Sequence, residues 1–116
     1  MNRGDVVLVD FPFTDGSASK IRPALVVQND RDNGRLRDTI LALITGNISR
    51  VAEPTQLLVD PATPDGASSG LHGPSAVLGS HLYTVQQSQV LRTIGHLPAN
   101  LMQQVNDCLK AALEIP

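Results

Sequence analysis

The stretch TILALITGNI, residues 39–48, is an almost uninterrupted apolar run, and it is the segment on which a fold for this chain is best built. A strand with one solvated face alternates apolar and polar residues, whereas a short apolar run without alternation is typical of a strand buried on both faces. We therefore expect residues 39–48 to form a strand with core on either side.

Further strands are predicted on both sides of this run. GDVVLVDFPF (4–13) and RPALVVQN (22–29) combine β-branched residues with flanking glycine or proline, and a flexible connection, 15–19, joins them. Asn-Gly inside the charged run 30–38 indicates a turn or short loop. Downstream, the candidate strands are 54–60, 75–78 and 90–97, with residues 81–88 between the last two and a Pro/Gly/Ser-rich loop at 61–74.

Near the end of the chain, the spacing of apolar residues changes from that of a strand to that of a helix. From Leu101 to Leu113 the apolar residues recur at helical spacing, and Pro98 suits the first turn of a helix. Several short strands closed by one helix predict a mainly β fold with a C-terminal α-helix, in which a small twisted sheet curls into a partly open barrel. With 116 residues, the chain is expected to form a single domain, 1–116.

Composition limits the possible functions. The chain is 41% hydrophobic and 17% charged, with a formal net charge of −2, which argues against binding nucleic acid through a broad basic surface. A local phosphate site remains possible, because seven of the nine basic residues fall in the first fifty positions. The single cysteine, Cys108, cannot form an internal disulfide, and we find neither a signal peptide nor a membrane-length apolar run. A cytoplasmic protein is expected.

Arg22 is the first candidate site residue. Proline disfavours the helical region for the residue before it, so Pro23 holds Arg22 in extended geometry. A guanidinium on such a stem offers a rigid fork of donors suited to phosphate. The alternative is a structural ion pair with a carboxylate such as Asp10.

Thr45 is the second candidate. It ends the apolar run, and Gly46 follows with a sterically open backbone amide, so hydroxyl and amide can both donate to a phosphate oxygen. The alternative is that threonine is simply a favourable strand residue. The three histidines are too unevenly spaced to predict a metal pair, and no nucleotide-cofactor or nucleophile-elbow motif occurs. No metal and no cofactor are expected.

The ordered set of motifs resembles the MazF/PemK family of toxin–antitoxin ribonucleases. The resemblance runs from GDVVLVDFPFTDGSASKIRPALVVQND through TILALITGNIS, PTQLLVD and GLHGPSAV to LRTIGHLPANLMQQVNDCL. It implies an SH3-like barrel that acts as a homodimer and cuts single-stranded RNA without a metal. It also implies a cognate antitoxin as partner, contact with DNA only through that antitoxin, and no membrane association.

Carried over by position, the resemblance places the catalytic arginine on Arg22 and the catalytic threonine on Thr45. The implied reaction uses the 2′-hydroxyl of the RNA as nucleophile, and the two side chains stabilise charge on the phosphate. The predicted RNA-binding residues are Ser17, Ser19, Lys20, Gln28, Gly46 and His81.

The chain departs from some relatives at one place. Leu78 and Ser80 stand where those relatives carry a charged pair, which leaves the general acid and base unassigned; His81 is a candidate because imidazoles titrate near neutral pH. Two alternatives therefore stay open. One is a non-catalytic, gyrase-binding toxin similar to CcdB, and the other is an inactive barrel that binds only RNA or an antitoxin.

Overall fold

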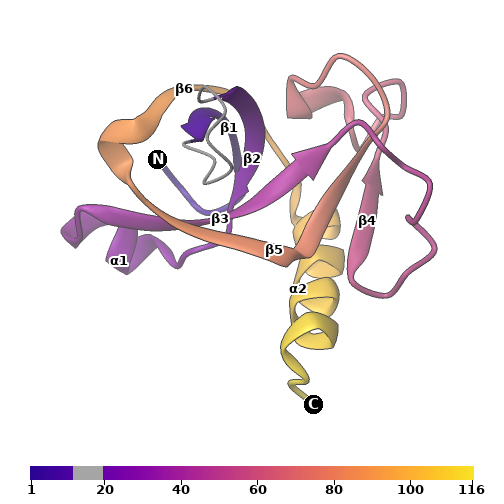
Figure 1. Ribbon diagram of the computed structural model, residues 1–116. Helices are drawn as coiled ribbons and strands as arrows, with labels where there is room; N and C mark the ends of the chain where they lie inside the picture. The colour runs from indigo at the N-terminus through magenta and orange to yellow at the C-terminus, as the bar shows by residue number, and fades with distance from the viewer. Residues whose placement is uncertain (12–19) are drawn as a thin grey trace.

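The computed structural model describes residues 1–11 and 20–116 (Figure 1). Over these residues the elements, in chain order, are β1 (Asp5–Phe11), β2 (Lys20–Val26), α1 (Asp30–Arg35), β3 (Asp38–Thr45), β4 (Gln56–Val59), η1 (Ala67–Ser69), β5 (Ser75–Gln86), η2 (Gln87–Gln89), β6 (Val90–His96) and α2 (Ala99–Leu113).

The strands form one antiparallel sheet in the order β4-β5-β3-β2-β1-β6. Figure 1 shows the sheet curling, so that β5 leads through η2 into β6, which returns beside β1. Helix α2 packs against β5 and β4. The predicted mainly β class, a partly open barrel closed by a C-terminal helix, is confirmed.

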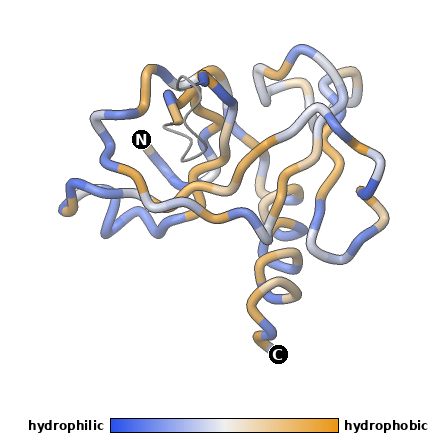
Figure 2. Tube along the Cα trace, in the orientation of Figure 1, coloured by the Kyte–Doolittle hydropathy of each residue, from blue (hydrophilic) through white to orange (hydrophobic). Residues whose placement is uncertain are grey.

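The central strand has core on both faces, as its sequence predicts. Ala42 and Ile44 join the cluster beneath α2, with Val105 and Cys108 of the helix. Leu41 faces the opposite cluster, which the curl of the sheet encloses. Hydropathy along the chain follows this arrangement, since apolar residues concentrate in the middle strands and recur along α2 (Figure 2). Burial of these two faces supplies most of the driving force for folding.

The segment 30–38 is not the turn or loop that its Asn-Gly pair indicates, because residues 30–35 form helix α1. Asn29 caps the helix by accepting a 2.9 Å hydrogen bond from the Asp32 backbone N–H. Two acidic residues in the first turn and Arg35 in the last complement the helix dipole. Local capping therefore outweighs the turn preference of Asn-Gly.

The pieces expected at 75–78 and 81–88 are one strand, β5, with an irregularity in its pairing. The register to β3 shifts between Ala42–Leu82 and Leu43–Leu78, so three residues of β5 lie opposite no residue of β3. A side chain at Gly79, within that shift, would place a Cβ 3.0 Å from the Thr55 carbonyl oxygen and 3.1 Å from that of Cys108. The glycine therefore lets α2 lie close to the sheet.

None of the helices in residues 1–11 and 20–116 has both the length and the apolar character needed to cross a bilayer.

Candidate active site

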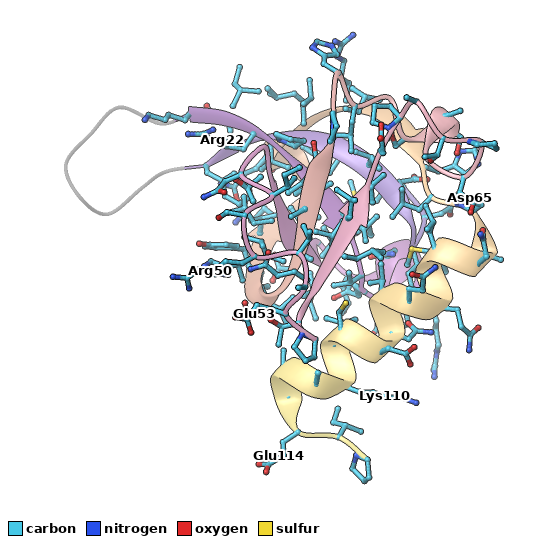
Figure 3. All side chains as sticks on the ribbon, turned by 90° about the vertical axis from the view of Figure 1, so that its right-hand side faces the viewer. Arg22, Arg50, Glu53, Asp65, Lys110 and Glu114 are labelled. Carbon is cyan, nitrogen blue, oxygen red and sulfur yellow. The ribbon has the colours of Figure 1, made fainter. Side chains whose placement is uncertain are left out.

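Arg22 lies in β2 opposite Val9 of β1 and is exposed. Figure 3 shows it at the outer end of β2, at the opposite end of the molecule from Glu114. Within the part of the chain that the structure describes, its guanidinium makes no hydrogen bond or ion pair, so the alternative ion pair with Asp10 is not formed. Among residues 1–11 and 20–116, no group occupies the donors of Arg22.

Thr45 is the last residue of β3, and its side chain is half-buried. Its Oγ1 accepts a 3.2 Å hydrogen bond from the Asn47 backbone N–H, which leaves the hydroxyl hydrogen to be donated elsewhere. Gly46 is exposed, and a Cβ built on it would have no heavy atom within 4 Å. The end of β3 is thus open to an incoming group.

The register between β2 and β3 relates these two residues. The last paired residues are Ala24 and Leu43, and two further steps along each strand lead to Arg22 and Thr45. Because strand side chains alternate between faces, both residues fall on the face that carries Ala24 and Leu43. The two candidate side chains therefore emerge on one face, beyond the point where the β2–β3 ladder ends.

The other residues predicted to contact RNA lie in different surroundings. Lys20 begins β2 and is exposed, whereas Ser17 and Ser19 lie outside the described residues. His81 is exposed within the shifted part of β5, with its Nδ1 3.1 Å from the Ser80 hydroxyl oxygen.

Gln28 lies in a different environment from the one expected of an RNA contact. Its side chain is 8% exposed and donates to Asn33 Oδ1 at 3.0 Å and to the Asp38 carbonyl at 2.9 Å. The sequence predicts a strand over 22–29, in which residues 22 and 28 would share a face, but β2 ends at Val26 and this alternation does not extend to residue 28. We do not retain Gln28 among the RNA contacts.

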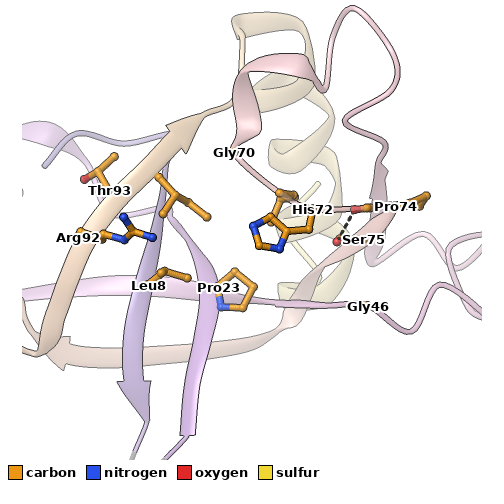
Figure 4. Close-up of a pocket in the computed structure, with 12 residues that line it drawn as sticks. Leu8, Pro23, Gly46, Gly70, His72, Pro74, Ser75, Arg92 and Thr93 are labelled. Atoms are coloured by element: carbon orange, nitrogen blue, oxygen red, sulfur yellow. Dashed lines mark hydrogen bonds between the residues drawn. The ribbon is translucent and has the colours of Figure 1, made fainter.

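A cavity of about 700 Å³ is lined by residues that follow the candidate pair along the chain (Figure 4). Its lining residues Leu8 and Pro23 alternate with Val9 and Arg22, so the cavity opens on the other face of the sheet. Pro23, which follows Arg22, and Gly46, which follows Thr45, both line it. The side chains of Arg92 and His72 also line it, and sequence reasoning assigned a site role to neither of them. In the sequence, Arg92 stands out only as a charged residue within the apolar segment 90–97, and that pattern does not show what its side chain faces.

The two clear pKa shifts concern groups that do not line this cavity. Burial, followed by the negative charge of Asp107, raises the pKa of the Cys108 thiol. A hydrogen bond from Asn29 and the nearby Arg35 lower the pKa of Asp32. Over residues 1–11 and 20–116, no three His, Cys, Asp or Glu side chains are grouped so that they could hold a metal ion.

Comparisons with known proteins match nearly the whole chain. Residues 2–113 match the family described as PemK-like, MazF-like toxin of type II toxin–antitoxin system. The chain is 28% identical over 116 residues to Endoribonuclease EndoA of Bacillus subtilis (strain 168), covering 99% of this chain and 96% of that protein. It is 31% identical over 117 residues to Endoribonuclease MazF2 of Mycobacterium bovis, covering 99% and 98%.

Solved structures share the fold. An endoribonuclease in complex with its cognate antitoxin, from a mycobacterial species, superposes with a TM-score of 0.80 at 22% identity, covering 100% of this chain and 97% of that one. MazE–MazF from Deinococcus radiodurans superposes with a TM-score of 0.77 at 20% identity, covering 100% and 98%.

Proposed function

Because the chain belongs to the PemK-like, MazF-like toxins of type II toxin–antitoxin systems, we propose that it is an endoribonuclease that cuts single-stranded RNA and thereby arrests translation and growth. One observation carries the assignment of its site: the β2–β3 register brings Arg22 and Thr45 to one face, just beyond the last paired residues Ala24 and Leu43.

The proposed reaction uses the RNA itself as nucleophile. The ribose 2′-oxygen attacks the adjacent phosphorus and loses its proton, while the bond from phosphorus to the 5′-oxygen breaks and that oxygen gains a proton. The products are a 2′,3′-cyclic phosphate and a free 5′-hydroxyl. This reaction needs no metal-bound water, and the task of the protein is to align the attack and stabilise negative charge.

Arg22 and Thr45 divide this task. The guanidinium donates charge-assisted hydrogen bonds to the non-bridging phosphate oxygens, and the Thr45 hydroxyl donates one more. Arginine stays protonated in proteins, so Arg22 acts as an electrostatic donor and not as a free base. Removing one preorganised donor of this kind slows a reaction by roughly 100- to 1,000-fold.

The partners follow from the family. A cognate antitoxin would neutralise the toxin, and the mycobacterial endoribonuclease compared above is itself in complex with its cognate antitoxin. We propose a homodimer in the cytoplasm, and the exposed Leu58, Leu113 and Ile115 leave apolar surface that a second copy would cover. Sedimentation analysis at micromolar protein concentration should give twice the chain mass of 12.3 kDa.

Cleavage of a long, weakly structured transcript in EDTA tests the activity. We expect defined cuts with 5′-hydroxyl ends from the wild type, and a loss of roughly 100-fold or more in Arg22→Ala. Arg31→Ala is the matched control, because Arg31 is an exposed arginine of α1 and lies outside the ends of β2 and β3 that carry the candidate pair. An intact transcript with the wild type, together with measurable RNA binding, would identify an inactive barrel instead.

The gyrase-binding alternative is not favoured. The matching family is that of PemK and MazF, and the relatives compared above are named endoribonucleases.

A further inference from the structure

Helix α1 has no apolar side chain with which to pack on the sheet. Its six residues, Asp30–Arg35, are polar or glycine, and Asn33 is the one member of the helix that is buried. A helix of this length is marginal on its own in water, so contacts outside it must hold it in place. Figure 1 shows α1 beside the start of β3, at the periphery of the molecule. The contacts of Asn33 therefore decide whether α1 stays folded.

The side-chain amide of Asn33 makes four hydrogen bonds. Its Oδ1 accepts from Gln28 Nε2 at 3.0 Å and from the Thr39 hydroxyl at 2.7 Å. Its Nδ2 donates to the Gln28 carbonyl at 2.9 Å and to Asp30 Oδ1 at 3.4 Å. A carboxylate in place of this amide would turn the Nδ2 donor into an acceptor that faces two other acceptors. The site is therefore specific for an amide.

A second side chain holds the helix from η2. Gln87 Nε2 donates to the carbonyl of Asn33 at 2.8 Å, to that of Leu36 at 3.0 Å and to that of Asp38 at 3.4 Å. The first two carbonyls belong to the end of α1, where backbone acceptors lack partners within the helix. A segment held by a few hydrogen bonds, and by no apolar contact of its own side chains, opens at a smaller free-energy cost than the whole protein unfolds.

Gly34, which follows Asn33, has no packing reason to be a glycine. A Cβ built on it would have no heavy atom within 4 Å, and it is not among the residues with a positive φ. Glycine inside a helix is less favourable than alanine. What Gly34 provides is an unhindered backbone nitrogen directly after an asparagine. In an opened chain, such a nitrogen attacks the preceding side-chain amide more readily than one whose residue carries a Cβ.

We propose that Asn33 is a site of spontaneous deamidation that is protected while α1 is folded and reacts when α1 opens. In this reaction the Gly34 nitrogen bonds to Asn33 Cγ and loses its proton, the bond from Cγ to Nδ2 breaks, and ammonia leaves. Water then opens the succinimide to aspartate or isoaspartate. The folded state prevents the attack, because four hydrogen bonds fix the amide and the helix fixes the backbone. The inference does not depend on the proposed ribonuclease activity.

The product cannot restore the folded helix. An aspartate at position 33 would place a negative charge beside Asp30, at a position where the native side chain is 8% exposed. An unpaired charge in such surroundings is strongly unfavourable. Isoaspartate adds a carbon to the backbone and so interrupts the helical hydrogen bonds. Deamidation is therefore a one-way change, and the contacts of Asn33 and Gln87 set how long the native protein lasts.

Peptide mapping by mass spectrometry measures deamidation of Asn33 in mildly alkaline buffer, with and without urea. We expect the folded wild type to react more slowly than the unfolded chain by roughly tenfold or more. Gln87→Ala should speed the reaction of the folded protein roughly tenfold and leave the rate in urea unchanged, because it removes bonds that hold α1 closed. Gln103→Ala, at an exposed glutamine of α2, is the matched control and should behave as the wild type. Gly34→Ala should suppress the reaction even in urea.

Asn33→Asp reproduces one product directly. We expect its unfolding equilibrium constant to rise roughly 10- to 100-fold, as for buried groups left without partners. Asn100→Asp makes the same change of charge at an exposed residue of α2 and should not destabilise the protein. If Asn33→Asp does not fold, the rates of the wild type, Gln87→Ala and Gly34→Ala still decide the question.

Four results would overturn the inference. Equal deamidation rates with and without urea would show that α1 does not protect Asn33. Absence of deamidation under both conditions would show that the Asn-Gly pair is unreactive. Equal rates for folded Gln87→Ala and Gln103→Ala would remove the opening step, and an Asn33→Asp protein as stable as Asn100→Asp would show that the product is harmless. None of these measurements uses RNA, so their failure is distinct from a failure of the proposed function.

Discussion

The contact between η1 and β6 predicts the effect of a single added methyl group. Gly95 lies in β6 opposite Val6, and a Cβ built on it would stand 2.5 Å from the Ser69 carbonyl oxygen and closer still to that of Ser68. Both atoms belong to the backbone, so neither can turn aside as a flexible side chain would. Gly95→Ala therefore requires the 68–70 segment to move by about 1 Å, in an interior packed as densely as a crystal.

The size of the effect follows from two opposing terms. Overpacking of this kind costs about 1–3 kcal/mol. Replacing glycine with alanine also restricts the unfolded chain, which returns about 0.4–1 kcal/mol. The net expectation is a decrease of about 1–2 kcal/mol in the free energy of unfolding.

Urea denaturation followed by circular dichroism measures this change. Gly73→Ala is the matched control, since Gly73 belongs to the same loop and a Cβ there would have no heavy atom within 4 Å. Its free energy of unfolding should stay within about 0.5 kcal/mol of the wild type. Equal unfolding midpoints for the two variants, at equal m-values, would refute the packing described for η1 and β6.

Three further predictions concern the fold outside the cavity. Gln28→Leu removes two hydrogen bonds from a buried network, so the free energy of unfolding should fall by about 1–3 kcal/mol. RNA cleavage by the folded protein should be unchanged, and a cleavage defect would return Gln28 to the proposed RNA contacts. The Cys108 thiol is 6% exposed with a raised pKa, so Ellman's reagent should label it only in denaturant, and rapid labelling of native protein would contradict its burial. The pKa of Asp32 lies below its usual 3.8, lowered first by the hydrogen bond from Asn29 and then by Arg35. This carboxylate therefore stabilises α1 above about pH 4, and the stabilisation is lost as pH falls through the folded pKa. Asn29→Ala should raise the pKa of Asp32 in an NMR titration, and an unchanged pKa would count against the cap.

Features set by local periodicity could be predicted from the sequence. The apolar run 39–48 became β3 as far as Thr45, buried on both faces, whereas residues 46–48 lie outside the strand. The apolar stripe that includes Leu101 and Val105 became the buried face of α2. In both cases the pattern itself determines which side chains must leave water. Leu113 is the exception, since it lies at the end of α2 and is 55% exposed.

Features that depend on how segments meet could not be predicted. A strand over 22–29, as the sequence predicts, would put Gln28 on the same face as Arg22, but β2 ends at Val26 and the Gln28 side chain enters a buried network instead. Arg92 and His72 are separated by twenty residues, and only the packing of the 68–70 segment on β6 brings both to one cavity. No periodicity in the sequence encodes that contact.

Every proposal for the site depends on Arg22 and Thr45 acting on one phosphate. The most direct measurement is a double-mutant cycle of single-turnover cleavage rates in EDTA, with Arg22→Ala, Thr45→Ala and the double variant on one mapped oligonucleotide. We expect each single substitution to cost roughly 100- to 1,000-fold, and the double variant to be little slower than the worse single variant, because residues that act as a unit are not additive. A double variant slowed by the product of the two single effects would show that the residues act independently, and would contradict a shared site.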